Sequence, residues 1–191
     1  MADRNGTDLA WELRRIVAGR RRRRRRIALS AMAGCAAAPL FASIIWKPPL
    51  LLAWNVSESA PVGLYRVEPN APVRRGDMVI AWTPEPARTL AARRHYLPAN
   101  VPLVKRVAAT SGDTVCAIGP VVSINGRRVV ERRRFDGRGR VLPWWEGCVT
   151  LRSGELFLLM TDAADSFDGR YFGPTGAQDV LGRARLLWPA S

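Results

Sequence analysis

The sequence predicts a mainly β protein, in which one antiparallel β domain follows a single N-terminal transmembrane helix. Residues 27–46 form an uncharged, apolar stretch of twenty residues. After Asn55 the apolar segments are short and punctuated by glycine and proline, which is typical of strands. The chain has 191 residues, 48% of them hydrophobic, which is enough for one compact domain and one further element.

Residues 1–26 form a basic arm. They contain ten arginines, seven of them consecutive at 20–26, against three acidic residues, so the arm holds +7 of the chain's +14. A polyarginine run could bind nucleic acid. Because this run directly precedes the apolar stretch, a role in membrane topology is the better explanation, and we expect no nucleic-acid partner.

Residues 27–46 have the length of a membrane span. Twenty helical residues cover about 30 Å, the thickness of the hydrocarbon core of a bilayer. The alternatives are a buried core helix and a cleaved signal sequence, whose apolar region is usually only about 7 to 15 residues long. Since arginines beside a span stay in the cytoplasm, we expect a bacterial inner-membrane protein with a cytoplasmic arm and a periplasmic domain at 47–191. The side chains that suit the lipid interface are Trp46, Lys47 and Trp54.

The periplasmic part predicts a series of short strands. Asn125 and Gly126 lie between two of them, and both residue types adopt positive φ readily, which predicts a tight hairpin. Several short strands at this spacing indicate an antiparallel sheet or a barrel-like fold. The expected strands are 63–67, 77–82, 103–108, 121–124, 129–130, 155–160 and 181–188.

The cysteines and the single histidine give no metal-binding pattern. There are three cysteines, no Cys-x-x-Cys spacing, and one histidine, His95, so we expect neither a metal site nor a cofactor. Cys116 and Cys148 both fall in the periplasmic part, where oxidising conditions would allow a disulfide; the sequence leaves that pairing open. Cys35 lies in the apolar stretch and is best explained as a small apolar residue.

Lysine is rare in this chain, which has 28 arginines and only two lysines. Arginine cannot act as a base because its pKa exceeds about 12, so Lys105 is the one lysine beyond the membrane edge that could. Strand alternation places it on the face of Leu103 and Val107, with Arg106 on the other face. An apolar face would lower the pKa of Lys105. If the pKa fell from its usual value by about three, the neutral amine would be common at pH 7. The alternative is a solvent-exposed lysine that protects a sheet edge.

Ser59 lies in a turn-rich segment just beyond the predicted span. As a nucleophile it would need an adjacent base, and the domain offers Lys105 or His95. We prefer Lys105, because His95 follows two arginines in a predicted loop. The alternative is an ordinary turn serine.

Four segments, in this order, resemble the type I signal peptidases, and most closely the conjugative transfer peptidases of the TraF type. The resemblance covers residues 55–188 and implies a signal peptidase/LexA-like antiparallel β domain. Two departures favour the transfer branch: Ala60 replaces the usual methionine, and residues 161–164 read TDAA. A third departure, Gly169, stands where a serine is common. The segments are 59–65 (SAPVGLY), 76–80 (GDMVI), 103–107 (LVKRV) with 111–113 (SGD), and 165–173 (DSFDGRYFG) with 181–183 (LGR).

The resemblance also implies roles for individual residues. Ser59 would be the nucleophile and Lys105 the general base. The Ser57 hydroxyl and the Ser59 backbone N–H would form an oxyanion hole. The residues that would support the site are Ser166, which orients the lysine amine, and the ion pair of Asp168 with Arg170. Structural alternatives are a turn hydroxyl for Ser57, a cap for Ser166 and a surface pair for Asp168 with Arg170.

By this resemblance, the chain is expected to be a membrane-anchored serine endopeptidase that processes an exported precursor, such as the pilin precursor of a conjugative transfer system. Cleavage and ring closure of the product both remain open. The expected partners are the precursor polypeptide, membrane lipid and components of the conjugation or type IV secretion apparatus. The alternatives are a general type I signal peptidase, a noncatalytic membrane-anchored scaffold, and a self-cleaving repressor, which would need a DNA-binding helix pair where this chain has the predicted span.

Overall fold

The computed structural model describes residues 27–38 and 49–190, which belong to two units, Met1–Pro48 and Pro49–Ser191. In the first unit, residues 27–38 form a helix. Within the described residues, no helix is long and apolar enough to cross a membrane. The predicted arm at 1–26 and the second part of the predicted span, from residue 39 onward, lie outside the described residues.

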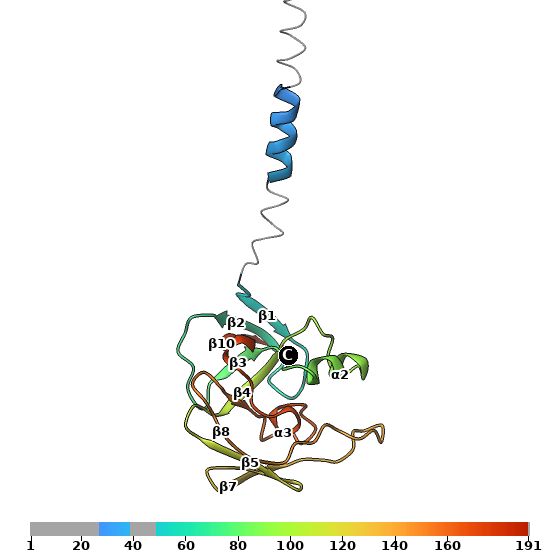
Figure 1. Ribbon diagram of the computed structural model, residues 1–191, viewed down its shortest axis with the longest axis vertical. Helices are drawn as coiled ribbons and strands as arrows, with labels where there is room; N and C mark the ends of the chain where they lie inside the picture. Colours follow the sequence, from blue (N-terminus) through green and yellow to red (C-terminus); the bar gives the residue numbers. More distant parts are fainter. Residues whose placement is uncertain (1–26, 39–48, 191) are drawn as a thin grey trace, which may run out of the picture. The chain divides into compact units, whose positions relative to one another are not determined.

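The second unit contains two antiparallel sheets, which confirms the prediction of a mainly β, antiparallel class (Figure 1). The larger sheet has six strands and positions the site described below. In spatial order they are β1 (Leu52–Asn55), β2 (Gly63–Glu68), β10 (Val180–Pro189), β3 (Met78–Ala81), β4 (Leu103–Ala109) and β9 (Phe157–Leu158).

The smaller sheet has four strands and contains the predicted hairpin. The strands are, in spatial order, β7 (Arg127–Glu131), β6 (Val121–Ile124), β5 (Thr114–Ile118) and β8 (Gly147–Thr150). Asn125 and Gly126 have φ of 51° and 76° between β6 and β7, as the two-residue turn requires. Cys116 and Cys148 lie directly opposite each other on β5 and β8, and their sulfur atoms are bonded at 2.01 Å.

Three strands and three short helices were not predicted. The strands are β1, β5 and β8, and the helical segments are α2 (Ala87–Arg93), α3 (Gly169–Phe172) and the 3₁₀ turn η1 (Ala177–Asp179). Conversely, the strand expected at 155–160 is reduced to the two residues of β9. Leu156 forms only an isolated bridge to Thr175, and after Leu159 the chain leaves the sheet in the loop that carries part of the site.

The larger sheet buries one apolar face against the loops of the site. Tyr65 and Val67 of β2, Ile80 of β3 and Val104 of β4 pack together with Met160. Each fully buried side chain of this kind stabilises the fold by about 1.5 to 3 kcal/mol. The loops of the site pack against this buried cluster, which supports them.

Candidate active site

Lys105 lies in the middle of β4 with its side chain buried. Only 3% of the residue is exposed, and its neighbours on the same face, Leu103 and Val107, are buried as well. Arg106 points the other way and is exposed. The alternation predicted from the sequence is therefore confirmed, and the alternative of a solvent-exposed lysine at a sheet edge is wrong.

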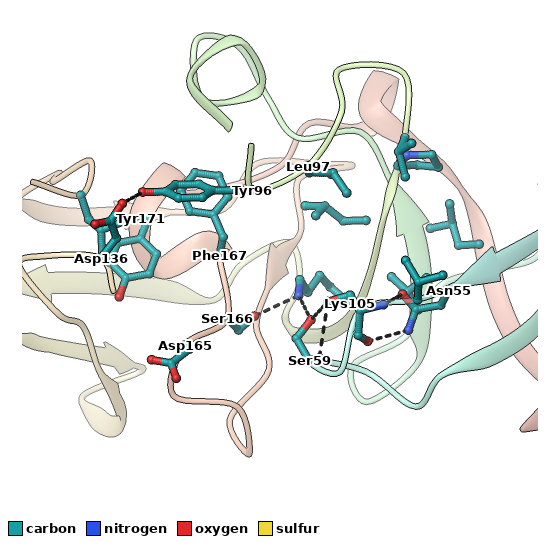
Figure 2. Close-up of a pocket in the computed structure, with 18 of the residues that line it drawn as sticks. Asn55, Ser59, Tyr96, Leu97, Lys105, Asp136, Asp165, Ser166, Phe167 and Tyr171 are labelled. Atoms are coloured by element: carbon teal, nitrogen blue, oxygen red, sulfur yellow. Dashed lines mark hydrogen bonds between the residues drawn. The ribbon is translucent and has the colours of Figure 1, made fainter. Parts of the chain in front are cut away.

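The amine of Lys105 contacts two hydroxyl groups from different loops (Figure 2). Its Nζ lies 2.6 Å from Ser59 Oγ and 2.9 Å from Ser166 Oγ, and it donates a hydrogen bond to each. The residues come from positions 59, 105 and 166, so the fold brings together three segments that are distant in sequence. A neutral amine in this position can accept the proton of Ser59.

The surroundings of Lys105 favour its neutral form. The pKa of Lys105 is lowered from 10.5 to about 8, mainly because the amine is buried; the negative charge of Asp168 acts to raise the pKa, and the positive charge of Arg170 acts to lower it. With a pKa of about 8, about one molecule in ten carries the neutral amine at pH 7. That fraction is several hundred times larger than for a lysine in water.

Ser59 lies in the loop that joins β1 to β2, and Asn55 fixes this loop from its base. The buried Asn55 side-chain amide donates to the carbonyl oxygens of Ser57 at 2.9 Å and of Ala60 and Pro61 at 3.1 Å. Its Oδ1 accepts the backbone N–H of Ser57 at 3.1 Å. Sequence reasoning missed Asn55, although an asparagine two residues before a turn residue is a recognised turn signal.

Ser57 lies beside the hydroxyl of Ser59, the predicted nucleophile. The two Oγ atoms are 3.0 Å apart, and the Ser59 backbone N–H approaches Ser57 Oγ at 3.5 Å. A hydroxyl and a backbone N–H therefore lie on the same side of Ser59. Donors in such a position can stabilise an oxyanion that forms on a carbonyl attacked by Ser59.

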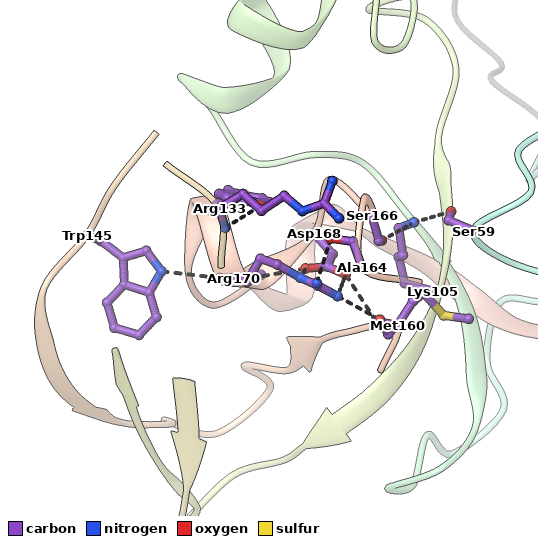
Figure 3. Close-up of polar contacts among 11 residues, drawn as sticks. Ser59, Lys105, Arg133, Trp145, Met160, Ala164, Ser166, Asp168 and Arg170 are labelled. Atoms are coloured by element: carbon purple, nitrogen blue, oxygen red, sulfur yellow. Dashed lines mark hydrogen bonds and ion pairs between the residues drawn. The ribbon is translucent and has the colours of Figure 1, made fainter. Parts of the chain in front are cut away.

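Ser166 is held by a buried ion pair in its own loop (Figure 3). Arg170 Nε donates to Asp168 Oδ1 at 2.8 Å and Nη2 to Oδ2 at 3.1 Å, with 1% and 0% of the two side chains exposed. Arg170 also donates to the carbonyl oxygens of Met160 and Ala164, and the Met160 N–H donates to Asp168. The loop from Met160 to Arg170 is thus tied to the pair, and because the pair is buried, the alternative of a surface pair is wrong.

Close packing explains why position 169 is a glycine, where the resemblance would lead us to expect a serine. A Cβ on Gly169 would lie 2.8 Å from Leu158 O and from the Phe157 ring of β9. Gly169 therefore lets α3 approach β9 closely, and no serine hydroxyl fits there without a shift of the backbone.

The three side chains lie in a pocket of about 510 Å³. One part is lined by β1 and by the end of β4, and another part by aromatic residues that the sequence analysis did not single out, Tyr96, Phe135 and Phe167. His95, the alternative base, is exposed and does not line the pocket. Cys116 and Cys148 do not line it either, and the described residues contain no group of side chains that could hold a metal ion.

Residues 24–189 match the family model described as signal peptidase, peptidase S26. A plasmid transfer protein TraF of Escherichia coli is 35% identical over 147 residues, which cover 70% of this chain and 82% of that protein. A conjugal transfer protein TraF of Agrobacterium tumefaciens (strain 15955) is 38% identical over 144 residues, covering 70% and 80%. Among solved structures, a signal peptidase I from Enterococcus faecalis V583 is 20% identical with a TM-score of 0.34, covering 62% of this chain and 98% of that one.

Proposed function

This chain belongs to the signal peptidase family, peptidase S26, and we propose that it is a membrane-anchored serine endopeptidase that uses Ser59 and Lys105 to process exported precursors of a conjugative transfer system. The observation that carries the proposal is the distance of 2.6 Å between Lys105 Nζ and Ser59 Oγ, at a lysine that is 3% exposed. A buried, uncharged amine beside a hydroxyl is the arrangement that a serine nucleophile needs from its base.

The reaction begins when neutral Lys105 accepts the Ser59 proton and Ser59 Oγ attacks the carbonyl carbon of the cleaved bond. The oxyanion accepts hydrogen bonds from the Ser59 N–H and the Ser57 hydroxyl. The protonated Lys105 then gives its proton to the leaving amine, which leaves an acyl group on Ser59. Water activated by Lys105 hydrolyses that ester and returns the enzyme to its starting state.

Ser166, Asp168 and Arg170 position the base. Ser166 Oγ accepts one hydrogen bond of the amine and keeps Nζ directed at Ser59. The ion pair fixes the loop of Ser166, and its two charges act on the pKa of Lys105 in opposite directions, Asp168 raising it and Arg170 lowering it. Removing either partner would leave an uncompensated buried charge, which typically costs about 3 to 5 kcal/mol.

The substrate we propose is a pilin precursor. The curated relatives described above are plasmid and conjugal transfer proteins, and this supports a transfer substrate rather than the general set of secreted proteins. Hydrolysis releases a linear product. If an amine of the product reaches the acyl group on Ser59 before water does, a closed peptide ring forms instead.

The anchoring part of the proposal places the second unit on the periplasmic side of the inner membrane. The uncharged stretch 27–46 and the arginines before it support a span with a cytoplasmic arm. The outer face of the larger sheet adds support, because Trp54 of β1 is 56% exposed and Trp188 of β10 is 71% exposed. Exposed tryptophans of this kind suit the lipid interface.

The test is a cleavage assay on a purified pilin precursor, with the product identified by mass. The wild type is expected to cleave, whereas Ser59→Ala and Lys105→Ala are expected to lose at least about 10³-fold in rate, because each removes one half of a unit that works only as a pair. Ser111→Ala is the matched control, since Ser111 is an exposed turn serine outside the pocket. Processing by either dyad variant at the wild-type rate contradicts the proposal. A product lighter than the linear fragment by one water indicates ring closure.

A further inference from the structure

The pocket extends beyond Ser59 and Lys105 into a second part, which we name the aromatic compartment. Figure 2 shows Tyr96, Phe167 and Tyr171 on one side of Lys105, with Asn55 on the opposite side. The mechanism proposed above uses none of these aromatic rings. Charged side chains, Arg133, Asp136 and Asp165, also line the pocket. The aromatic and apolar lining of the compartment is formed by Tyr96, Leu97, Phe135, Leu142, Phe167 and Tyr171.

The walls of the aromatic compartment are fixed before any substrate binds. The ring of Phe167 lies 5.3 Å from that of Tyr96 and is stacked on Tyr171 at 5.9 Å. The Tyr96 hydroxyl donates to Asp136, and Asp136 also accepts from Arg140 Nε at 2.7 Å. The loop after α2 is thereby joined to the loop that carries Phe135. A preformed wall of this kind does not have to be ordered at the expense of binding energy.

The proton transfer determines which part of a substrate enters the compartment. Lys105 must deliver its proton to the leaving amine, so the segment that follows the cleaved bond leaves past Nζ. The second partner of Nζ is Ser166, and the next residue along the chain, Phe167, already lines the compartment. The residues after the cleaved bond are therefore directed toward the aromatic rings, and the residues before it toward β1.

We propose that the aromatic compartment is a subsite for an apolar or aromatic side chain within the first three residues after the cleaved bond, with Phe135 and Leu97 as specificity-determining residues. This inference rests on the proposed peptidase function. Phe135 is 50% exposed, and the residues next to it in its loop are mostly arginine and glycine. An exposed ring at the edge of a pocket is available to cover an incoming side chain. A large apolar side chain in such a subsite is expected to raise kcat/KM by about 10- to 100-fold over alanine.

The experiment uses the full chain in detergent micelles and a set of synthetic peptides as probes. All peptides carry the same small residues before the cleaved bond and differ in having alanine, leucine, phenylalanine or lysine at each of the three following positions. The wild type is expected to prefer phenylalanine or leucine at one of these positions by at least about 10-fold in kcat/KM. Phe135→Ala and Leu97→Ala are each expected to reduce that ratio by at least about 5-fold.

Ile118→Ala is the matched control for these variants. Ile118 is exposed, at 65%, but it lies in the smaller sheet and does not line the pocket, so its substitution is expected to leave the ratio unchanged. Equal cleavage of all peptides by the wild type overturns the subsite but not the peptidase function. The same conclusion follows if both variants keep the wild-type ratio of kcat/KM between the preferred peptide and the alanine peptide. A second set of peptides keeps the residues after the cleaved bond constant and carries alanine, leucine or phenylalanine before it; if Phe135→Ala alters the preference in this set instead, the assigned direction is wrong. If the wild type cleaves neither the peptides nor the purified precursor, the peptidase function fails and the subsite with it.

Discussion

At the scale of single residues, the partners of Lys105 explain why its pKa is low without being extreme. Both groups in direct contact with Nζ are neutral hydroxyls, so no carboxylate stabilises the charged form at short range. Asp168 acts on Lys105 only through its charge, and Arg170 beside it acts in the opposite direction. Burial is left as the largest influence, and the pKa of the amine is about 8.

The first prediction concerns the pH dependence of cleavage. In the proposed mechanism the unprotonated amine is the reactive form. Because the pKa of Lys105 is about 8, kcat/KM is expected to rise about tenfold per pH unit between pH 5.5 and 7 and to level off above about pH 8.5. Initial rates on a fluorogenic peptide across this range provide the measurement.

The same profile has an internal control. Replacing Asp168 by asparagine removes the negative charge that raises the pKa of Lys105, so the rising part of the profile is expected to move to lower pH in whatever fraction of that variant folds. A wild-type profile that is flat from pH 5.5 to 9 would show that no amine with this pKa limits the reaction.

The residue scale also shows what the sequence could and could not predict. Lys105 could be identified from composition, because it is the one lysine beyond the predicted membrane edge, and its buried face followed from alternation. Its distance to Ser59 depends on how β4 and the β1–β2 loop meet, which no local pattern encodes. Asn55 was missed because its role consists of four backbone contacts that exist only once the loop has closed.

At the scale of elements, the β1–β2 loop is a turn built around one side chain. Asn55 is the last residue of β1, and its amide spans the loop to Ala60 and Pro61, while the Tyr65 hydroxyl of β2 donates to Pro61 O at 2.8 Å. The loop is thus tied to both strands that flank it. Ser59 lies between these ties, so its position is set by the loop as a whole.

The second prediction tests this role of Asn55 as a positioning residue. Asn55→Ala removes every hydrogen bond that the Asn55 side chain makes to the β1–β2 loop. It is expected to lower kcat by about 10- to 100-fold and to change KM by less than about 3-fold, because displacement of the proposed nucleophile affects the chemical step more than binding. The free energy of unfolding is expected to fall by about 1 to 3 kcal/mol. Steady-state kinetics and thermal unfolding measure the two effects.

Asn55→Asp and Asn100→Ala complete this comparison. Aspartate keeps the acceptor for the Ser57 N–H but cannot donate to the three carbonyl oxygens, so it is expected to be nearly as impaired as alanine. Asn100 is an exposed loop asparagine, and its substitution is expected to change neither quantity. If Asn55→Ala keeps the wild-type kcat, the loop does not depend on Asn55 for its active shape.

Some elements were predictable from the sequence and others were not. The strands β2, β4, β6 and β10 are short apolar segments, and the hairpin turn has the Asn-Gly pair, so all of them have a local signature. β1 and β8 are four residues long and are stabilised by pairing with β2 and β5, respectively. Their conformation therefore depends on tertiary contacts more than on local sequence. β5 was missed although its alternating pattern was present. The helix α2 has only seven residues, too few for a helical period to show.

At the scale of the whole second unit, the two faces of the larger sheet have different chemistry. The inner face of β1, β2 and β10 packs in the core through Ala53, Tyr65 and Leu186. On the outer face, the register aligns Trp54 of β1 with Leu64 of β2, and Leu64 with Trp188 of β10. The next row on that face is formed by Leu52, Arg66 and Arg185.

These two rows, Trp54, Leu64 and Trp188 with Leu52, Arg66 and Arg185, form what we name the outer-face patch. Its aromatic and leucine side chains are suited to the boundary of a bilayer, and its two arginines are suited to anionic headgroups. The patch lies at the end of the sheet where the β1–β2 loop carries Ser59. A domain bound to lipid through this patch would hold Ser59 close to the membrane surface, where an exported precursor emerges.

The third prediction concerns binding of this patch to lipid. A chain of residues 49–191, which form a compact unit, is expected to co-sediment with vesicles containing anionic lipid and to bind vesicles of zwitterionic lipid more weakly. The double variant Trp54→Ser with Trp188→Ser is expected to bind at least about tenfold more weakly to both, because it removes the two largest exposed apolar side chains of the patch. Arg66→Gln with Arg185→Gln is expected to remove much of the preference for anionic vesicles, because each arginine contributes about 1 kcal/mol to binding of an anionic surface.

Ile118→Ser is the matched control for these variants. Ile118 is 65% exposed but belongs to the smaller sheet, so this variant should bind vesicles like the wild type. Equal binding by the wild type and the tryptophan variant would mean that the outer face does not contact lipid, and the anchoring proposal would then rest on residues 27–46 alone.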